Sequence, residues 1–350
     1  MYIGLFVFLF LISLISVESR YLKIVALVLT FILVVFAGTR LEIAPDYQMY
    51  YYGFYDAVKY EFFLRDQPTF EYCMYVIPNL VFLFFKNYFV QVSFIVFAVL
   101  GVSSKMIVIK KADFFILSFF LYFTNLYFIQ EMITIRAGIA SGIFFLSIKD
   151  LENEDDRSFF LKFFIALLFH YSSIIFLLVW FCLRFNIKYY ITGLCLSFVF
   201  IFFKLNILTL LFLDRLFPKV QIYLDILESE GQEDINLFNF RIIFAILVSV
   251  FFFISYNKLE EKKLFVVLFK THLISLILFF ILSTTAITFS LRAYELLSVV
   301  QILLYPMTLL LLQGSYKYIG YGVIFCFCFV QFFYMTESSK LFIDYNSWIF

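Results

Sequence analysis

Two adjacent stretches of opposite character decide the fold: YLKIVALVLTFILVVFA at residues 21–37 and GTRLEIAPDYQMY at residues 38–50. The first is apolar and long enough to cross the hydrocarbon of a bilayer as a helix. The second opens the first part of the chain in which charge is frequent, and it places tyrosines between acidic and basic side chains. A membrane helix followed by a polar, tyrosine-rich loop therefore organises the rest of the chain.

Composition extends this pattern to the whole sequence. Hydrophobic residues make up 64% of the 350, Phe alone accounts for 55, and the mean hydropathy is +1.00. Soluble domains do not bury that much apolar surface, and the alternating pattern of an outer-membrane barrel is absent. The sequence predicts an all-α, polytopic membrane bundle of about 10–12 transmembrane or re-entrant helices, about ten of them full spans. Because no soluble domain or internal repeat is visible, residues 1–350 are interpreted as a single integral membrane domain.

The distribution of basic residues predicts the orientation. Cytoplasmic loops are rich in Lys and Arg, and basic clusters occur at residues 105–111, 149–162 and 258–263. With these on the cytoplasmic side, two large loops, about 39–70 and 204–239, lie outside together with both termini.

Three segments do not follow a simple count of spans. Residues 159–182 must break near His170 and return to the cytoplasmic side, and residues 70–85 must be peripheral or re-entrant. Residues 114–128 and 133–148 are expected to form a hairpin whose tight turn holds Gln130 and Glu131.

The tyrosine-rich loop has two interpretations. Sugar rings bind to flat aromatic faces such as Tyr47 and Tyr50, carboxylates such as Asp46 accept from sugar hydroxyls, and guanidinium groups such as Arg40 bind phosphate. The alternative is an interfacial belt, because Tyr is enriched where a protein crosses from lipid to water.

Ionisable residues near the external ends of membrane helices are the other candidates, because such groups are rare there without a function. Arg136 lies early in a helix and is either functional or an anchor at the interface. His170 is more readily a structural group than a catalytic one. Arg292 and Glu295 are three residues apart on one helical face, and the alternative is that they pair with each other.

Several classes of function are not supported. A net charge of +1 gives no indication of a nucleic-acid partner. Two histidines, and cysteines without metal-type spacing, predict no metal centre. No motif of a soluble enzyme or of a cofactor-binding fold is present.

Three motifs resemble those of the EpsG/Wzy-type polysaccharide polymerases: Phe36–Arg40 with Asp46, Tyr47 and Tyr50; Ile135–Ala140; and Leu168–Ser172. Their order and spacing carry the resemblance over the first half of the chain, and Ser290–Arg292 adds to it in the second half. The chain departs from the family pattern by inserting Leu41–Pro45 and by having Ala137 where Gln is common.

The resemblance implies an enzyme of O-antigen or exopolysaccharide biosynthesis in the bacterial inner membrane. Such a polymerase transfers a growing undecaprenyl-diphosphate-linked glycan onto a new lipid-linked repeat unit at the periplasmic face, without a cofactor. Its partners are the lipid-linked oligosaccharide, the bilayer and a chain-length regulator protein.

The same resemblance suggests roles for the candidate residues. Arg136 and Arg292, followed by Arg40, are expected to stabilise the departing diphosphate, because guanidinium groups bind it bidentately. Asp46, His170 and Glu295, in that order, are the candidate bases for the acceptor hydroxyl.

Other functions remain open at this point. A flippase or other transporter would use cavity arginines but should place charge along its whole path. A glycan ligase shares the carrier and the arginines. A membrane acyltransferase needs a histidine with a supporting acid, and the sequence shows no close acid beside His170. A structural membrane subunit would not need these motifs.

Overall fold

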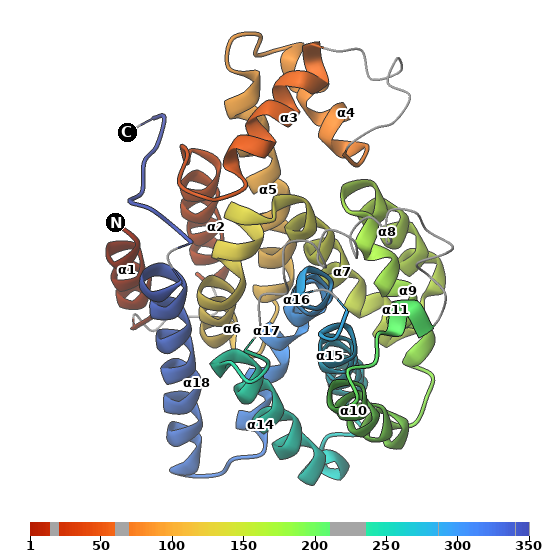
Figure 1. Cartoon of the computed structure of the whole chain (residues 1–350). Coiled ribbons are helices and arrows are strands. Elements are labelled where there is room, and N and C mark those ends of the chain that lie inside the picture. The colour runs from red at the N-terminus through yellow and green to blue at the C-terminus, as the bar shows by residue number, and fades with distance from the viewer. Residues whose placement is uncertain (15–20, 60–69, 211–235, 286, 340, 350) are drawn as a thin grey trace. The chain divides into compact units, whose positions relative to one another are not determined.

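The computed structural model describes residues 1–14, 21–59, 70–210, 236–285, 287–339 and 341–349. Every regular element in these ranges is helical, apart from one isolated antiparallel bridge between Arg40 and Ser347 (Figure 1). The prediction of an all-α membrane bundle is confirmed. The chain divides into two compact units: unit 1 contains Met1–Ile174 and Leu312–Phe350, and unit 2 contains Ile175–Leu311. The single membrane domain expected over residues 1–350 stays a prediction.

Unit 1 holds most of the candidate residues. Its helices are α1 (Tyr2–Leu14), α2 (Leu22–Gly38), α3 (Tyr47–Lys59), α4 (Cys73–Phe82), α5 (Phe89–Ile109), α6 (Phe115–Tyr122), the π-helix η2 (Phe123–Ile133), α7 (Ile135–Asn153), α8 (Asp156–Phe169), η3 (Tyr171–Ile174), α18 (Tyr316–Phe333) and η7 (Tyr334–Ser338).

Unit 2 is built around the long helix α15. Its helices are α9 (Ile175–Cys182), α10 (Ile187–Phe202), α11 (Ile207–Leu210), α14 (Phe240–Ile254), η4 (Tyr256–Lys258), α15 (Lys263–Leu282), α16 (Ile287–Leu297), η5 (Ser298–Val300), α17 (Gln301–Leu304) and η6 (Tyr305–Leu310).

The apolar helices of the described residues fall into two classes of length. Among the described residues, five helical stretches are long and apolar enough to cross a membrane: Phe89–Ile109, Phe115–Ile133, Lys263–Leu282, Phe289–Leu310 and Tyr316–Ser338. Six more apolar helices are shorter: Tyr2–Ile12, Leu22–Gly38, Cys73–Phe84, Tyr171–Cys182, Ile187–Phe202 and Phe240–Ile254. The five long and six shorter helices together agree with the prediction of about 10–12 transmembrane or re-entrant helices. The expectation that about ten of them cross the membrane fully stays a prediction.

Small residues let the central helices of unit 1 pack closely. A methyl group at Gly142 of α7 would lie 1.9 Å from Ser104 Oγ of α5, and one at Gly101 would lie 1.9 Å from Glu131 Oε2. Membrane helices that approach this closely do so through Gly and Ser, because lipid supplies no hydrophobic drive for association. The contact fixes α5, α7 and η2 against one another.

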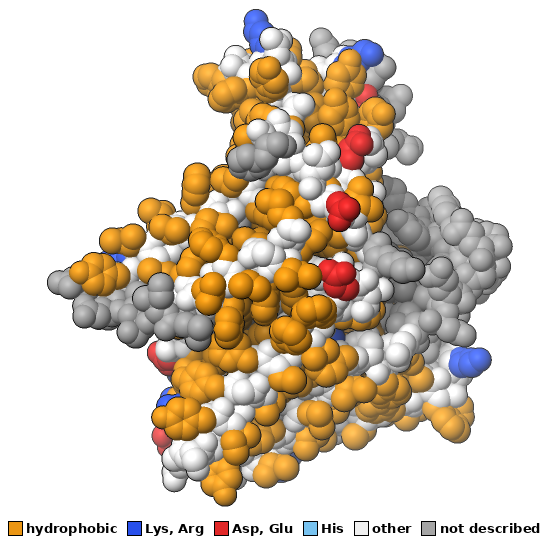
Figure 2. All heavy atoms as spheres, turned by 90° about the vertical axis from the view of Figure 1, so that its left-hand side faces the viewer, with side chains coloured by type: hydrophobic (Ala, Val, Ile, Leu, Met, Phe, Trp, Pro, Cys, Tyr) orange, Lys and Arg blue, Asp and Glu red, His pale blue; other side chains and the backbone are white. Residues whose placement is uncertain are grey.

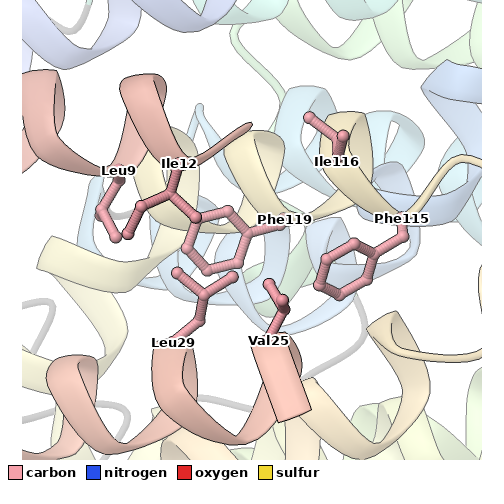
Figure 3. A pocket seen from close by; sticks show the side chains of 7 residues that line it. All are labelled: Leu9, Ile12, Val25, Leu29, Phe115, Ile116 and Phe119. Carbon is pink, nitrogen blue, oxygen red and sulfur yellow. The ribbon is translucent and has the colours of Figure 1, made fainter. Parts of the chain in front are cut away.

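The outer surface of unit 1 is suited to lipid. Exposed side chains on α1 and α18 include Phe8, Leu11, Ile319 and Phe329, and Figure 2 shows the predominantly hydrophobic face to which these helices contribute. A small hollow between α1, α2 and α6 is also apolar (Figure 3). It is lined by Leu9, Ile12, Val25, Leu29, Phe115, Ile116 and Phe119.

The break predicted near His170 is confirmed. α8 ends at Phe169, and His170 takes an extended conformation with φ −156° and ψ 118°. α4 has only 10 residues, about half the number that a span requires, as expected for a peripheral or re-entrant element.

One expectation about the loops is wrong. No tight turn occurs at Gln130 and Glu131, because the π-helix η2 continues through both and ends at Ile133. The segment 39–70 contains the helix Tyr47–Lys59, and its external position stays a prediction. Of the second external loop, residues 211–235 lie outside the described residues.

Candidate functional site

A buried carboxylate, Glu71, lies at the centre of the candidate site in unit 1. Its Oε2 forms an ion pair with Arg136 Nη1, and its Oε1 lies 3.0 Å from His170 Nδ1. The backbone N–H of Tyr171 also donates to Oε1, at 3.4 Å. Glu71 is 4% exposed, so one carboxylate joins an imidazole, a guanidinium and the broken end of α8 inside the protein.

Three helix ends bring these groups together. Glu71 precedes α4, Arg136 lies in the first turn of α7, and His170 follows α8. α4 is fastened to α3 by Asn79, whose Nδ2 donates to the carbonyl oxygen of Ala57 at 2.9 Å. Charged groups at helix ends can reach into a cavity without breaking a helix within lipid.

The surroundings keep Glu71 ionised. Burial acts to raise the pKa of its carboxyl group, but the hydrogen bond with His170 and the charge of Arg136 outweigh burial and lower the pKa to about 2. When the ring of His170 is neutral and Nδ1 carries the proton, Nε2 is left as an acceptor. Nε2 is buried and has no hydrogen-bond partner. The pair has the arrangement of a general base held by a carboxylate.

Aromatic rings fix the orientation of Arg136. Its guanidinium carbon lies 5.1 Å from the ring centre of Phe70 and 5.6 Å from that of Tyr50. Such cation–π contacts hold a planar guanidinium in place. Nε of Arg136 has no hydrogen-bond partner, so the side chain keeps one donor beyond its ion pair.

Arg40 lies in a separate, more deeply buried position. It is 1% exposed, its Nη1 donates to the carbonyl oxygen of Ala37, and its guanidinium lies 4.9 Å from the ring centre of Phe94. Phe94 is in turn stacked on Tyr47, with 4.9 Å between ring centres.

A second buried ion pair lies between α5 and η2. Lys105 Nζ donates to Glu131 Oε1 at 2.5 Å and to the carbonyl oxygen of Gly138 at 2.8 Å, and Tyr122 donates to the same carboxylate oxygen at 3.1 Å. Lys105 is 0% exposed, and so it does not belong to the cytoplasmic basic cluster in which the sequence places it.

The EpsG family model matches residues 23–347. The chain belongs to the EpsG family. This confirms the resemblance drawn from the three motifs. Comparison with curated proteins and with solved structures gave no match.

Membership of the EpsG family supports a polysaccharide polymerase-type function and a glycosyltransferase-like enzyme. It also implies a lipid-linked glycan as the general substrate of a multi-pass membrane protein.

The structure brings only some of the predicted residues together. Within this EpsG-family chain, Arg136 and His170 contact Glu71, and Tyr50 lies beside Arg136. Arg40 and Tyr47 both contact the ring of Phe94. Asp46 is half-buried and directly precedes α3.

Tyr47 and Tyr50 do not form an open surface for sugar rings. They are 2% and 1% exposed, because residues 47, 50, 54 and 57 face inward at the spacing of a helix. The exposed rings on α3 are those of Tyr52 and Tyr55. A sequence interpreted as a loop has no such inward face, and the expectation is corrected for that reason.

Arg292 and Glu295 belong to α16 in unit 2, where both are half-buried. Nearby Arg241 donates to Ser298 Oγ at 2.9 Å and lies over the ring of Tyr294. From the sequence, Arg241 is expected to be an ordinary loop charge, and these contacts correct that expectation.

His272 lies toward the cytoplasmic end of its predicted helix, and the sequence favours a structural role for it, which agrees with its surroundings. It is 0% exposed, and its ring nitrogens lie 3.1 Å from Ser249 Oγ and 3.3 Å from Gln301 Nε2.

Sequence reasoning missed Glu71 and therefore also missed the acid beside His170. The two residues are 99 positions apart, so proximity along the chain does not reveal the pair. A usable signal was present: Glu71 is an isolated acid at the start of an apolar segment, where an ionisable group needs a partner.

Proposed function

We propose that the chain is a polymerase that transfers a growing undecaprenyl-diphosphate-linked glycan onto a new lipid-linked repeat unit. The observation that carries the proposal is the group formed by Glu71, His170 and Arg136. It combines an oriented imidazole with an unpartnered Nε2 and a fixed guanidinium in one buried place. Family membership gives the class of reaction, and this group supplies a means of performing it.

In the proposed reaction, Nε2 of His170 accepts the proton of the acceptor sugar hydroxyl. The hydroxyl oxygen then forms a bond to the anomeric carbon of the donor glycan, and the bond from that carbon to the diphosphate breaks. The diphosphate leaves with the electron pair. Glu71 stabilises the imidazolium that forms, and Arg136 adds positive charge beside the developing anion.

This proposal changes the order of the candidate bases. The sequence ranks Asp46 before His170 and Glu295. His170 now comes first, because it has both a buried carboxylate partner and an unpartnered nitrogen. The sequence favours a structural role for His170. In the structure, however, its Nδ1 contacts Glu71, and it is Glu71 that accepts the backbone N–H of Tyr171.

The site is proposed to face the periplasm of a bacterial inner membrane. Arg40, Arg136 and His170 occupy helix ends at one end of unit 1. The ends of α5 and α7 that point the other way carry exposed basic residues: Lys110, Lys111, Lys149 and Arg157. An excess of Lys and Arg marks the cytoplasmic side.

Cysteine labelling tests this orientation. In a cysteine-free background, Tyr52→Cys should react with an impermeant maleimide in intact spheroplasts, because Tyr52 is 60% exposed. Lys111→Cys should react only after the membrane is opened. The reverse pattern would place the site in the cytoplasm. Tyr47 is unsuitable for the test, since it is 2% exposed.

The bilayer and the lipid-linked oligosaccharide are the proposed partners, together with a chain-length regulator. A ligase remains the second candidate, because transfer of glycan from the same carrier needs the same base and guanidinium. An acyltransferase gains support from the acid beside His170, but the EpsG family favours glycan transfer.

Deletion of the gene, followed by gel analysis of surface glycan, tests the function. A polymerase defect leaves one repeat unit and removes the long ladder. Loss of all surface glycan would point to export, and a normal ladder with altered acylation would point to an acyltransferase. Purified protein should extend lipid-linked repeat units, and His170→Gln should not.

A further inference from the structure

Gly53 is a buried glycine in the middle of α3, where the backbone does not require one. Its conformation is ordinary helix, and glycine makes a helix less stable than alanine does. A methyl group at this position would lie 3.1 Å from Cε2 of Phe70 and 3.4 Å from Cε of Met74. The absence of a side chain at Gly53 therefore leaves the space that the ring of Phe70 needs.

Phe70 and its neighbour Glu71 hold Arg136 in two ways. The guanidinium carbon of Arg136 lies 5.1 Å from the ring centre of Phe70, and Nη1 of the same side chain pairs with the carboxylate of Glu71. Both residues precede α4, which begins at Cys73. Their position therefore depends on contacts other than the hydrogen bonds of a regular helix.

One such contact comes from Tyr75, in the first turn of α4. The backbone N–H of Phe70 donates to the hydroxyl oxygen of Tyr75 at 3.2 Å. Tyr75 is 3% exposed, and a buried tyrosine hydroxyl usually has a hydrogen-bond partner. Here the partner is the backbone that carries the ring of Phe70, so the hydroxyl fixes the point from which that ring extends.

α3 and α4 are fastened to each other beside this ring. Nδ2 of Asn79 donates at 2.9 Å to the carbonyl oxygen of Tyr75 and at 2.9 Å to that of Ala57, one turn after Gly53. Because one amide nitrogen bonds to both helices, the distance between the Gly53 turn of α3 and the Tyr75 turn of α4 is fixed. The ring of Phe70 is thus restrained by both helices.

We propose that Gly53 and Tyr75 are positioning residues for Arg136. Both act through the ring of Phe70: Gly53 leaves room for it, Tyr75 anchors its backbone, and the ring orients the planar guanidinium. The effect on glycan transfer rests on the proposed function, since it requires that Arg136 stabilises the departing diphosphate. The restraint on Phe70 does not depend on that function.

Gly53→Ala separates this role from a purely structural one. Alanine favours the helix, so the melting temperature in detergent should be unchanged or raised. The ring of Phe70 must give way by a few tenths of an ångström, and transfer by the purified protein should fall by about threefold or more. Gly322→Ala is the matched control, because this glycine lies within α18 and an added methyl group would meet nothing within 4 Å. It should transfer as the wild type does.

Tyr75→Phe removes only the hydroxyl group. The kcat for transfer should fall by about tenfold and the KM for the lipid-linked repeat unit should stay within about twofold, since the guanidinium is misplaced while binding of the repeat unit is retained. In an Arg136→Lys background the same substitution should cost less than about twofold, because the planar group that it positions is already absent. Tyr88→Phe removes a hydroxyl from a side chain that is 60% exposed and should leave transfer unchanged.

Amide hydrogen exchange of the full-length protein tests the restraint on Phe70 without any transfer. In Tyr75→Phe, the N–H of Phe70 should exchange about fivefold faster, through loss of one hydrogen bond. The N–H of Tyr171, which donates to Glu71 at 3.4 Å, should also exchange faster, because Glu71 follows Phe70 in the chain. Both amides should exchange at the wild-type rate in Tyr88→Phe.

These measurements distinguish failure of the proposal from failure of the polymerase function. Unchanged exchange at Phe70 in Tyr75→Phe would overturn the proposal, as would wild-type transfer in Gly53→Ala. Equal losses from Tyr75→Phe in the wild-type and Arg136→Lys backgrounds would also overturn it, because the hydroxyl would then act independently of Arg136. If Tyr75→Phe does not fold, Gly53→Ala decides the question. If the wild type transfers no glycan, the polymerase function fails, and exchange at Phe70 still shows whether Tyr75 restrains it.

Discussion

Two buried clusters in unit 1 each contain a carboxylate and a cation, but they differ in how many of their polar groups are hydrogen-bonded. In the Lys105 cluster, the carboxylate of Glu131 accepts from Lys105 and Tyr122, and Lys105 also donates to a backbone carbonyl. In the Glu71 cluster, the carboxylate is equally well bonded, yet His170 Nε2 and Arg136 Nε have no partner. We call the Lys105 cluster closed, because its charged groups bond to each other, to Tyr122 and to a backbone carbonyl. We call the Glu71 cluster open, because it keeps an unbonded acceptor and an unbonded donor.

The difference distinguishes charged groups that only stabilise the fold from charged groups that can react or bind a ligand. A closed network stabilises helix packing and has nothing to offer a ligand, whereas an incomplete one retains a base or a donor at the expense of stability. Lys105 and Glu131 join α5 to η2 directly before the turn that leads to Arg136. The closed cluster therefore supports the open one.

The largest expected effect comes from replacing His170, which carries the unbonded Nε2 of the Glu71 cluster. His170→Gln should reduce glycan transfer by about 10²–10⁴-fold, the usual contribution of a general base, while the melting temperature stays close to that of the wild type. Extension of lipid-linked repeat units by purified protein measures the rate. Asp46→Asn is the comparison variant and should transfer at close to the wild-type rate. A dead Asp46→Asn together with an active His170→Gln would reverse the assignment.

Variants of the closed Lys105 cluster should lower the stability of the fold rather than the rate of transfer. Lys105→Met leaves Glu131 buried without its cation and should destabilise the fold by about 3–5 kcal/mol. The double variant Lys105→Met, Glu131→Leu should recover much of this loss, because removing both charges leaves none unpaired. Thermal unfolding in detergent and transfer per folded molecule are the measurements. A stable but inactive Lys105→Met would show that the two clusters do not differ as described.

Arg136 should show an intermediate effect. Arg136→Lys keeps the charge beside Glu71 but loses the planar fork, and we expect a loss of about 2–4 kcal/mol of transition-state stabilisation, roughly a hundredfold in rate or more. Polymer length at matched expression is a convenient cellular measurement. Full-length polymer with both Arg136→Lys and Arg136→Ala would reduce the residue to an anchor at the interface.

The smallest effect concerns acid stability. The pKa of Glu71 is lowered in the folded protein from 4.5 to about 2. As the pH falls, Glu71 is therefore protonated in the unfolded chain before it is protonated in the folded protein. The stabilisation is fully present above about pH 5 and is lost progressively as the pH falls toward about 2. Unfolding free energy should decrease by about 2 kcal/mol from this group between pH 7 and pH 3.

Glu71→Gln serves as the control for that measurement, because it removes the titrating group. Its stability should change less steeply with pH over the same interval. Identical slopes for both proteins would show that Glu71 is not held by Arg136 and His170.

The class of fold followed from local properties of the sequence. The sequence shows apolar runs of helix-spanning length, basic clusters, and the motifs around Arg40, Arg136 and His170 without any knowledge of distant contacts. The break at His170 was also predictable, because the charge distribution requires one there.

The composition of the site depended on tertiary structure. Glu71 meets His170 across 99 positions, Tyr47 and Tyr50 turn inward only because α3 packs on α4 and α5, and Lys105 leaves the basic cluster to pair with Glu131. Hydropathy reports the solvent that a segment prefers, whereas pairing of buried charges depends on which helix ends meet in space. For Lys105 and Glu131, close packing at Gly101 and Gly142 sets α5 against η2 and α7.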